Sequence, residues 1–361
     1  MRSSVHRLSS PSLPANKVPF RLCALGILPG AFHFMSTCCA VVMLLTASSS
    51  TRAQTGMHAA KDASPTMPGS TARLVSPPAP ILPPSIPRDN GGACRLVENY
   101  RFGAFASAHD VAMDAFGDVY VTDGSRHTLH KFRIDGTEIR STGGQGWALE
   151  QFDQPGGIDA RMGLTVYVAD RGNNRIVRLD RDMHALGTFS TRDTPDPTQS
   201  FGEPLDVAAA RQGTLYILDG ENARVVTSSG FATIEHRFGG VDAGAGRLVR
   251  PVAMVLDDAD NVYVLEESRV VVFDAFGAWR FTFGEGILHG ARGISLRGNR
   301  GWIVTRDALH AWSIDGRLEA ARTVRDIFFA SPVAEFRNVA ESDGNVLLLT
   351  TTSVILLSCT Q

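Results

Sequence analysis

The chain has 361 residues, and its 35 basic residues nearly balance 37 acidic ones, which gives a formal net charge of −2. Nucleic-acid phosphates require a strongly basic footprint, so this charge balance argues against a nucleic-acid partner. Residues 94–361, which follow two N-terminal segments of different composition, have the length of one closed all-β domain.

Residues 1–53 have the features of an export signal. Basic residues such as Arg2 and Arg21 precede an apolar stretch that is strongest at residues 38–45, and residues 51–53 supply a small-x-small cleavage site. This order is typical of a signal peptide. An uncleaved membrane anchor is the alternative, although the apolar run is shorter than the ~20 residues of a spanning helix. We therefore expect a periplasmic or secreted protein with no stable membrane insertion after signal removal.

Residues 54–93 differ in composition from both neighbouring segments. They are rich in Pro, Ser and Ala, with Pro77-Pro78-Ala79-Pro80 and Pro83-Pro84 among them, and they contain almost no aromatic residues. Such a segment cannot bury enough apolar surface to form a core. We expect a disordered, extended linker.

Residues 94–361 contain six copies of one pattern, apolar–aromatic–apolar or a close variant. The central residues lie 39 to 49 positions apart, at Tyr120, Tyr167, Tyr216, Tyr263, Trp302 and Leu347. A period in the forties indicates a propeller or a solenoid. Gly and Asp recur at hairpin-turn positions within each copy. In the first copy they separate four expected strands, at residues 109–113, 118–122, 129–134 and 137–142.

The second copy carries the most recognisable motif residues. They are Gln151-Phe152 with Pro155, Val166-Tyr167-Val168-Ala169-Asp170, Asn174-Arg175-Ile176 and Leu179-Asp180. On these residues the chain resembles the NHL repeat family of six-bladed β-propellers. The last three copies depart from the pattern, because Glu266, Thr305 and Thr350 stand where the first three have Asp123, Asp170 and Asp219. The resemblance is specific for fold but implies no single function, because this fold carries unrelated activities.

The last copy supplies only three strands, at residues 336–341, 345–350 and 354–358. Residues 94–102 have the length and alternation of the missing fourth strand. If they join the last blade, the ring closes and no sheet edge stays exposed. The predicted fold is therefore all-β, a six-bladed propeller of four-stranded antiparallel blades closed by an N-terminal strand.

Two of the five cysteines remain after removal of the expected signal. Cys94 and Cys359 lie on the first and last strands of the proposed closure. In an oxidising compartment we expect them to form a disulfide, and two unrelated buried thiols are the alternative.

One rim of the ring is the expected binding surface. The connections between blades and the loops between second and third strands gather on the same face, because neighbouring strands are antiparallel. Loops on a rigid scaffold often carry function. The expected ligand-binding residues are Trp147, Arg171, Asn174, Glu221, Asn222 and Arg269. They suit a protein or glycan partner of a monomeric, non-catalytic binding protein, although an ordinary solvated rim would look similar.

The mouth of the central channel offers an alternative function. Asp110, Asp206 and Asn338 fall near the starts of inner strands, where their oxygens could hold a hard cation such as calcium. With His109 as the base, the protein would then be a metal-dependent hydrolase or lyase. Related propeller lyases use three histidines on zinc, and no repeated histidine pattern occurs here. We favour a hydrated channel without cofactor or catalytic residue.

Overall fold

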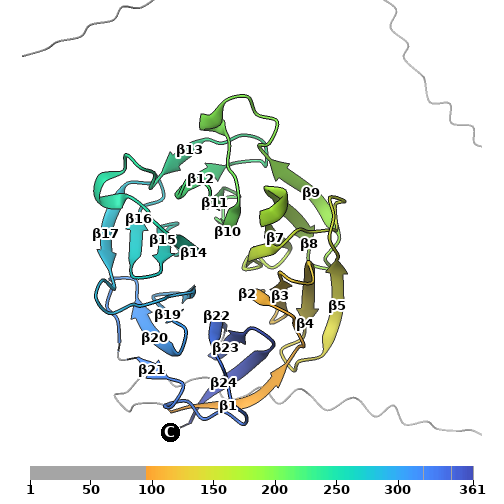
Figure 1. The fold of residues 1–361 in the computed structure, drawn as a ribbon, viewed down its shortest axis with the longest axis vertical. Coiled ribbons are helices and arrows are strands. Elements are labelled where there is room, and N and C mark those ends of the chain that lie inside the picture. The colour runs from red at the N-terminus through yellow and green to blue at the C-terminus, as the bar shows by residue number, and fades with distance from the viewer. Residues whose placement is uncertain (1–94, 320, 343, 361) are drawn as a thin grey trace, which may run out of the picture. The chain divides into compact units, whose positions relative to one another are not determined.

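The computed structural model describes residues 95–360 apart from residues 320 and 343. Six four-stranded antiparallel sheets surround a central axis as blades (Figure 1), which confirms the predicted six-bladed β-propeller. The predicted signal peptide, residues 1–53, and linker, residues 54–93, lie outside the described residues. No described helix is long and apolar enough to cross a bilayer.

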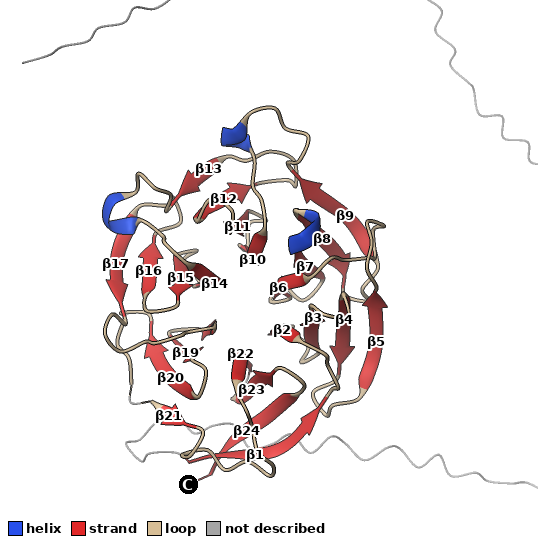
Figure 2. Cartoon of the chain, in the orientation of Figure 1, coloured by secondary structure: helices blue, strands red, loops and turns tan. Residues whose placement is uncertain are grey.

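Each blade begins at the channel and runs outwards (Figure 2). Blade 1 contains β2 (Ala108–Met113), β3 (Val119–Asp123), β4 (Thr128–Phe132) and β5 (Glu138–Gly143). Blade 2 contains β6 (Pro155–Asp159), β7 (Thr165–Asp170), β8 (Arg175–Asp180) and β9 (Ala185–Ser190). Blade 3 contains β10 (Pro204–Ala209), β11 (Leu215–Asp219), β12 (Arg224–Ser228) and β13 (His236–Phe238).

The remaining blades follow the same order. Blade 4 contains β14 (Pro251–Leu256), β15 (Val262–Glu266), β16 (Val270–Phe273) and β17 (Trp279–Phe283). Blade 5 contains β18 (Gly293–Arg297), β19 (Arg300–Val304), β20 (Ala308–Ser313) and β21 (Arg322–Thr323). Blade 6 contains β22 (Phe336–Ser342), β23 (Asn345–Thr350), β24 (Val354–Thr360) and β1 (Arg95–Phe102). Within residues 95–360 as described, three short 3-10 helices lie in loops, η1 (Arg171–Asn173), η2 (Pro197–Gln199) and η3 (Gly244–Gly246).

The ring closes between the two ends of the described chain. Strand β1 pairs antiparallel with β24, from Arg95 opposite Thr360 to Phe102 opposite Val354. This pairing confirms the predicted closure and covers the edge of β24. Cys359 lies opposite Leu96 in this register. Because Cys94 lies outside the described residues, the Cys94–Cys359 disulfide stays a prediction.

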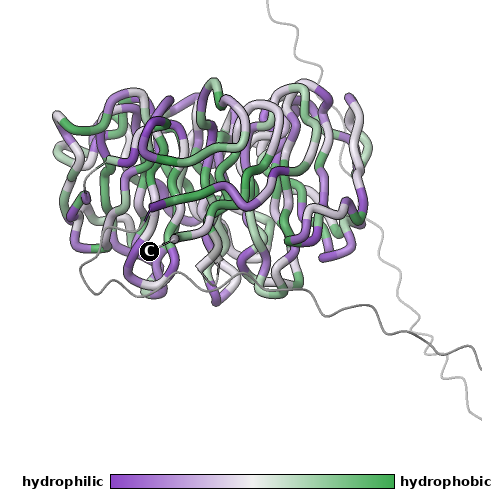
Figure 3. The backbone as a smooth tube through the Cα atoms, turned by 90° about the horizontal axis from the view of Figure 1, so that it is seen from below, coloured by the Kyte–Doolittle hydropathy of each residue, from purple (hydrophilic) through white to green (hydrophobic). Residues whose placement is uncertain are grey.

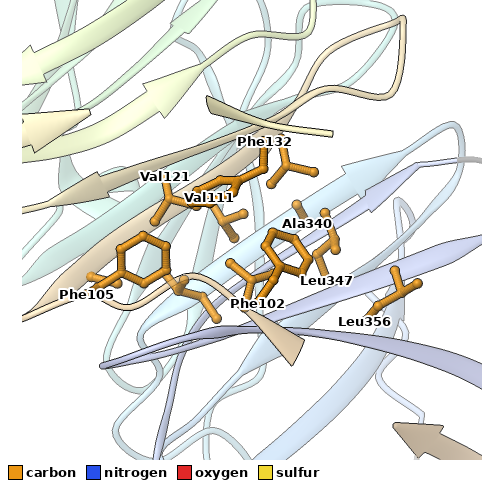
Figure 4. Packing of buried hydrophobic residues seen from close by; sticks show 12 residues of the cluster. Phe102, Phe105, Val111, Val121, Phe132, Ala340, Leu347 and Leu356 are labelled. Atoms are coloured by element: carbon orange, nitrogen blue, oxygen red, sulfur yellow. The ribbon is translucent and has the colours of Figure 1, made fainter. Parts of the chain in front are cut away.

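The hydrophobic core lies between the blades. Period-2 alternation gives each sheet two apolar faces, and each face packs on the neighbouring blade. At the closure, Val111, Val121 and Phe132 of blade 1 contact Leu347 and Leu356 of blade 6 (Figure 4). Five further buried clusters join the other neighbouring pairs of blades. Figure 3 shows hydrophobic segments running through the interior of the ring, while hydrophilic segments are more frequent towards its two faces.

Candidate functional site

The two faces of the propeller ring carry different loops. The connection face carries the links between blades, such as residues 144–154 and 191–203, and the loops between second and third strands. The hairpin face carries the turns between first and second strands, such as residues 114–118. Inner strands run from the connection face to the hairpin face, so residues at their starts surround the channel mouth on the connection face.

Asp110 joins two blades across the channel wall. One carboxylate oxygen accepts from the Val111 amide at 2.7 Å, and the other accepts from the Ile158 amide of blade 2 at 2.8 Å. The side-chain amide of Asn338 in blade 6 also donates to Asp110. Because its partners belong to three blades, this carboxylate stabilises the ring where it closes.

Asp206 repeats this arrangement in blade 3. Its oxygens accept from the Val207 amide at 2.8 Å and from the Met254 amide of blade 4 at 2.7 Å. Two glycines make room for these inward side chains. A Cβ at Gly157 would lie 2.0 Å from Asp206 Oδ1, and one at Gly293 would lie 2.1 Å from Asn338 Oδ1. The inner strands therefore alternate polar side chains with small neighbours.

We call Asp110, Asp206 and Asn338 the belt of the channel. Burial raises the pKa values of its two carboxyl groups. It raises the pKa of Asp110 to about 7, with a further contribution from Asp159, although the two amide donors oppose the rise. Burial and the nearby Asp110 raise the pKa of Asp206 well above its ordinary value. These groups line a cavity of about 90 Å³, which is enough for several water molecules.

The belt is the candidate cation site of the sequence analysis. Each oxygen of Asp110, Asp206 and Asn338 already accepts a hydrogen bond from a main-chain amide. A cation would have to compete with these amides. Across the described residues, no three His, Cys, Asp or Glu side chains converge closely enough to hold a metal ion.

His109 lies at the channel mouth on the connection face. Its Nε2 atom is 3.3 Å from Arg171 Nη1. The surrounding protein, with smaller contributions from Arg171 and Arg337, lowers the pKa of this exposed side chain. A neutral ring whose Nε2 accepts from the guanidinium fits both observations. In this arrangement the Nε2 lone pair faces Arg171 and is not directed at a substrate proton.

Buried acids at the ends of second strands hold the connections between blades. Asp170 accepts from the Asp153 amide at 2.7 Å and from Arg175 Nε at 2.7 Å. Asp123, Asp219 and Glu266 likewise accept from amides sixteen or seventeen residues upstream. Glu266 therefore keeps the role of the aspartates, although the sequence analysis treated it as a departure.

Three of the predicted rim residues belong to such loop contacts. Asn222 donates to Asp219, and Arg269 donates to Glu266. Asn174, which has a left-handed backbone with φ of 49°, accepts from the Glu203 amide at 2.6 Å. These side chains fix loop conformation, whatever else they contact.

Of the other three predicted rim residues, Trp147 and Glu221 are exposed and Arg171 is half-buried. Trp147 is 53% exposed, and the guanidinium carbons of Arg192 and Arg175 lie 4.9 and 5.8 Å from its ring centroid. Glu221 is exposed beside Gly202. Arg171 extends across Gly156 towards the channel mouth, where it pairs with Glu203 at 2.7 Å. Arg171 and Asn174 both contact Glu203, and Glu221 lies beside Gly202, so these three predicted residues meet at the connection before β10.

A cavity on the hairpin face carries no signal in the sequence pattern. It measures about 420 Å³ and combines apolar and charged side chains. Its lining includes Met113, Arg161, Met162, Arg211, Asp258 and Asp260. Asp260 has a left-handed backbone with φ of 60°, where the corresponding turns of blades 1 to 3 use glycine.

Comparison with known proteins identifies the repeat and the fold. The profile of the NHL repeat matches residues 105–132, which include β2, β3 and β4. A luciferin-regenerating enzyme is similar in structure at 11% identity, with a TM-score of 0.53 over 73% of this chain and 95% of that one. A chain of a nidogen–laminin complex matches at 14% identity and a TM-score of 0.52, over 68% of this chain and 97% of that one.

A gluconolactonase from Xanthomonas campestris is also similar, at 14% identity and a TM-score of 0.50 over 74% of this chain and 90% of that one. These similar structures include enzymes as well as a member of a protein complex, and likeness at such low identity establishes the fold alone. The chain is therefore a six-bladed β-propeller that contains an NHL repeat.

Proposed function

We propose that this propeller is an exported, non-catalytic binding scaffold that holds a protein or glycan partner on the rim of its connection face. Export rests on the signal-like residues 1–53. The binding role rests chiefly on one observation, the exposed indole of Trp147 between two arginines.

Trp147 has the properties of an interface anchor. Aromatic and arginine side chains contribute most of the energy at protein interfaces. Arg175 also donates to the Trp147 carbonyl at 2.9 Å and is itself paired with buried Asp170. The loop that presents the indole is therefore held in place before a partner arrives, which lowers the entropic cost of binding.

The channel offers less support for catalysis. Its carboxylates are occupied by main-chain amides of neighbouring blades, and His109 Nε2 faces a guanidinium. A structural role accounts for these contacts without a substrate. The nidogen–laminin complex gives a precedent for a propeller in a protein assembly.

Site-specific photocrosslinking tests the proposal. A photoreactive aromatic residue at position 147 should capture a partner in cells, whereas the same residue at position 276 should not. Phe276 is the matched control because it is 87% exposed and lies in a turn of the hairpin face. Once the partner is purified, Trp147→Ala should weaken binding by ~1–3 kcal/mol and Phe276→Ala should leave it unchanged. Equal capture from both positions would contradict the proposal.

A metal-dependent hydrolase or lyase is the second candidate, and the raised pKa of Asp110 beside an accessible cavity favours it. In that function Asp110, Asp206 and Asn338 would hold calcium and His109 would act as base. Elemental analysis of the purified mature domain distinguishes the two functions. Stoichiometric calcium or zinc that is lost on Asp206→Asn substitution would favour the enzyme.

A further inference from the structure

Four arginines and one histidine lie at the channel mouth on the connection face. They belong to four consecutive blades of the ring and comprise Arg171 of blade 2, His109 of blade 1, Arg337 of blade 6, and Arg292 and Arg306 of blade 5. His109 is within electrostatic range of both Arg171 and Arg337. We call this set the basic arc.

The charge of the basic arc is incompletely neutralised. Glu335 is shared by three guanidiniums, with Arg292 Nη1 and Arg337 Nη2 each 3.0 Å from a carboxylate oxygen. Arg306 Nε lies 3.9 Å away. Hydrogen bonding to Arg292 and the charge of Arg337 hold the pKa of Glu335 below its ordinary value. One carboxylate among three guanidiniums leaves positive charge for an external anion.

The guanidiniums also remain accessible. The side chain of Arg306 is 72% exposed, and that of Arg337 is 37% exposed. A guanidinium has five N–H donors. Arg337 uses Nε for Thr351 and Nη2 for Glu335, which leaves its Nη1 amino group without a hydrogen-bond partner among the described residues. The Nη1 group can therefore donate a charge-assisted hydrogen bond to an external carboxylate.

The neighbouring backbone shapes the other end of the basic arc. A Cβ at Gly156 would lie 2.6 Å from Arg171 Cδ, so only glycine lets this arginine cross the start of β6 and reach the mouth. There it contacts His109 and Glu203. Cationic groups on both sides of His109 suit a ligand with more than one anionic group.

We propose that the basic arc is a binding site for a small organic anion that carries two or more carboxylate groups. This site shares Arg171 with the expected rim residues but does not include Trp147, the anchor of the rim proposed above. Substitutions at Trp147 and at Arg337 therefore test the two sites separately.

Titration calorimetry with citrate tests the proposal on the mature protein. Citrate should bind at low ionic strength with an affinity that falls as salt is added, because salt screens exposed charges. The neutral trimethyl ester of citrate should not bind. Arg337→Gln should weaken citrate binding about tenfold or more, since it removes a charge-assisted hydrogen-bond donor and its positive charge.

Glu335→Gln should change citrate affinity in the opposite direction from Arg337→Gln. It removes the internal carboxylate that competes for the three guanidiniums, so citrate should bind several-fold more tightly. Arg211→Gln is the matched control, because Arg211 is an exposed arginine paired with Asp258 on the hairpin face. Its substitution, like Trp147→Ala, should leave citrate affinity unchanged.

Three results would overturn the proposal. They are failure of millimolar citrate to bind the wild-type protein, weaker binding to a folded Glu335→Gln variant, or equal losses from Arg337→Gln and Arg211→Gln. If a variant folds poorly, NMR of the wild-type protein still decides the question. Citrate should shift the ring signals of His109 and not those of the exposed His184 in the β8–β9 hairpin.

Discussion

Replacing Gly157 by alanine tests whether the channel carboxylates hold neighbouring blades together. The new Cβ would lie 2.0 Å from Asp206 Oδ1 and 2.7 Å from Asp206 Cα. Rotation of the aspartate relieves only the first contact, so β6 and β10 must also separate. Asp206 would then lose its bonds to the Val207 and Met254 amides.

The expected destabilisation follows from those two bonds. A buried amide left without its acceptor costs about 1–3 kcal/mol, so loss of both bonds in Gly157→Ala should lower the free energy of unfolding by about 2–6 kcal/mol. Urea unfolding followed by tryptophan fluorescence measures this difference. A domain of ordinary stability, about 5–15 kcal/mol, would survive with a clearly shifted midpoint.

Gly187→Ala is the matched control for this substitution. Gly187 lies in β9, and a methyl group added there would have no heavy atom within 4 Å, so alanine should change stability by less than about 1 kcal/mol. Combining Gly157→Ala with Asp206→Ala should cost less than the sum of the single changes, because both disrupt one contact. Equal stability of the Gly157→Ala and Gly187→Ala proteins would refute the reasoning.

Two further predictions concern cysteine chemistry and pH. Non-reducing peptide mapping of the exported protein should recover one cross-linked peptide containing Cys94 and Cys359, and reduction should lower stability by ~4 kcal/mol; recovery of two free thiols would contradict it. The contribution of Asp110 to the free energy of unfolding should fall as pH rises from 3.8, the ordinary pKa of aspartate, to about 7, its raised value. In that window folded Asp110 binds a proton that the unfolded chain has released, so this group favours unfolding as pH rises. The lowered pKa of His109 acts in the opposite direction below 6.5, so the quantity to measure is the difference in unfolding free energy between the wild-type and Asp110→Asn proteins. Urea titrations should show that this difference falls across the range, and a constant difference would contradict the prediction.

The repeat made most of the fold predictable from sequence. Regularly spaced aromatic residues defined the blades, and the missing strand of the last blade located β1. The outer strand of blade 5 was harder to predict from the sequence, because β21 spans only Arg322 and Thr323. Two residues are too few for alternation to mark a strand.

Glu266 differs in residue type from the aspartates at the equivalent position of blades 1 to 3, but its carboxylate makes the same kinds of contact. Its carboxylate accepts from the Arg250 amide and from Arg269, as the shorter aspartates do in blades 1 to 3. The loop that follows is one residue shorter than its counterparts, since β16 begins at Val270. Thr305 and Thr350 are true departures, because each hydroxyl bonds a carbonyl of its own turn.

The candidate site was only partly accessible to sequence reasoning. The repeat placed Asp110 and Asn338 in one phase, but their contact joins positions 228 residues apart and depends on ring closure. Arg337 was missed as a site residue, although it occupies the same phase as His109 and Arg292. Comparing that phase across all blades would have found it. The contacts of three arginines with Glu335 could not be predicted by this comparison. They depend on the directions of the side chains, which the sequence does not specify.

The order of charges along the channel bears on the choice between the two functions. An anion held by Arg171 and Arg337 meets buried Asp110 and Asp206 immediately below, and their carboxylates repel it once ionised. The rise in their pKa values reduces this repulsion near neutral pH but does not reverse it. An anionic ligand should therefore stop at the mouth, as a binding site requires. Catalysis deeper in the channel would need a cation in the belt to draw the anion inwards, so the metal content of the belt decides between the two functions.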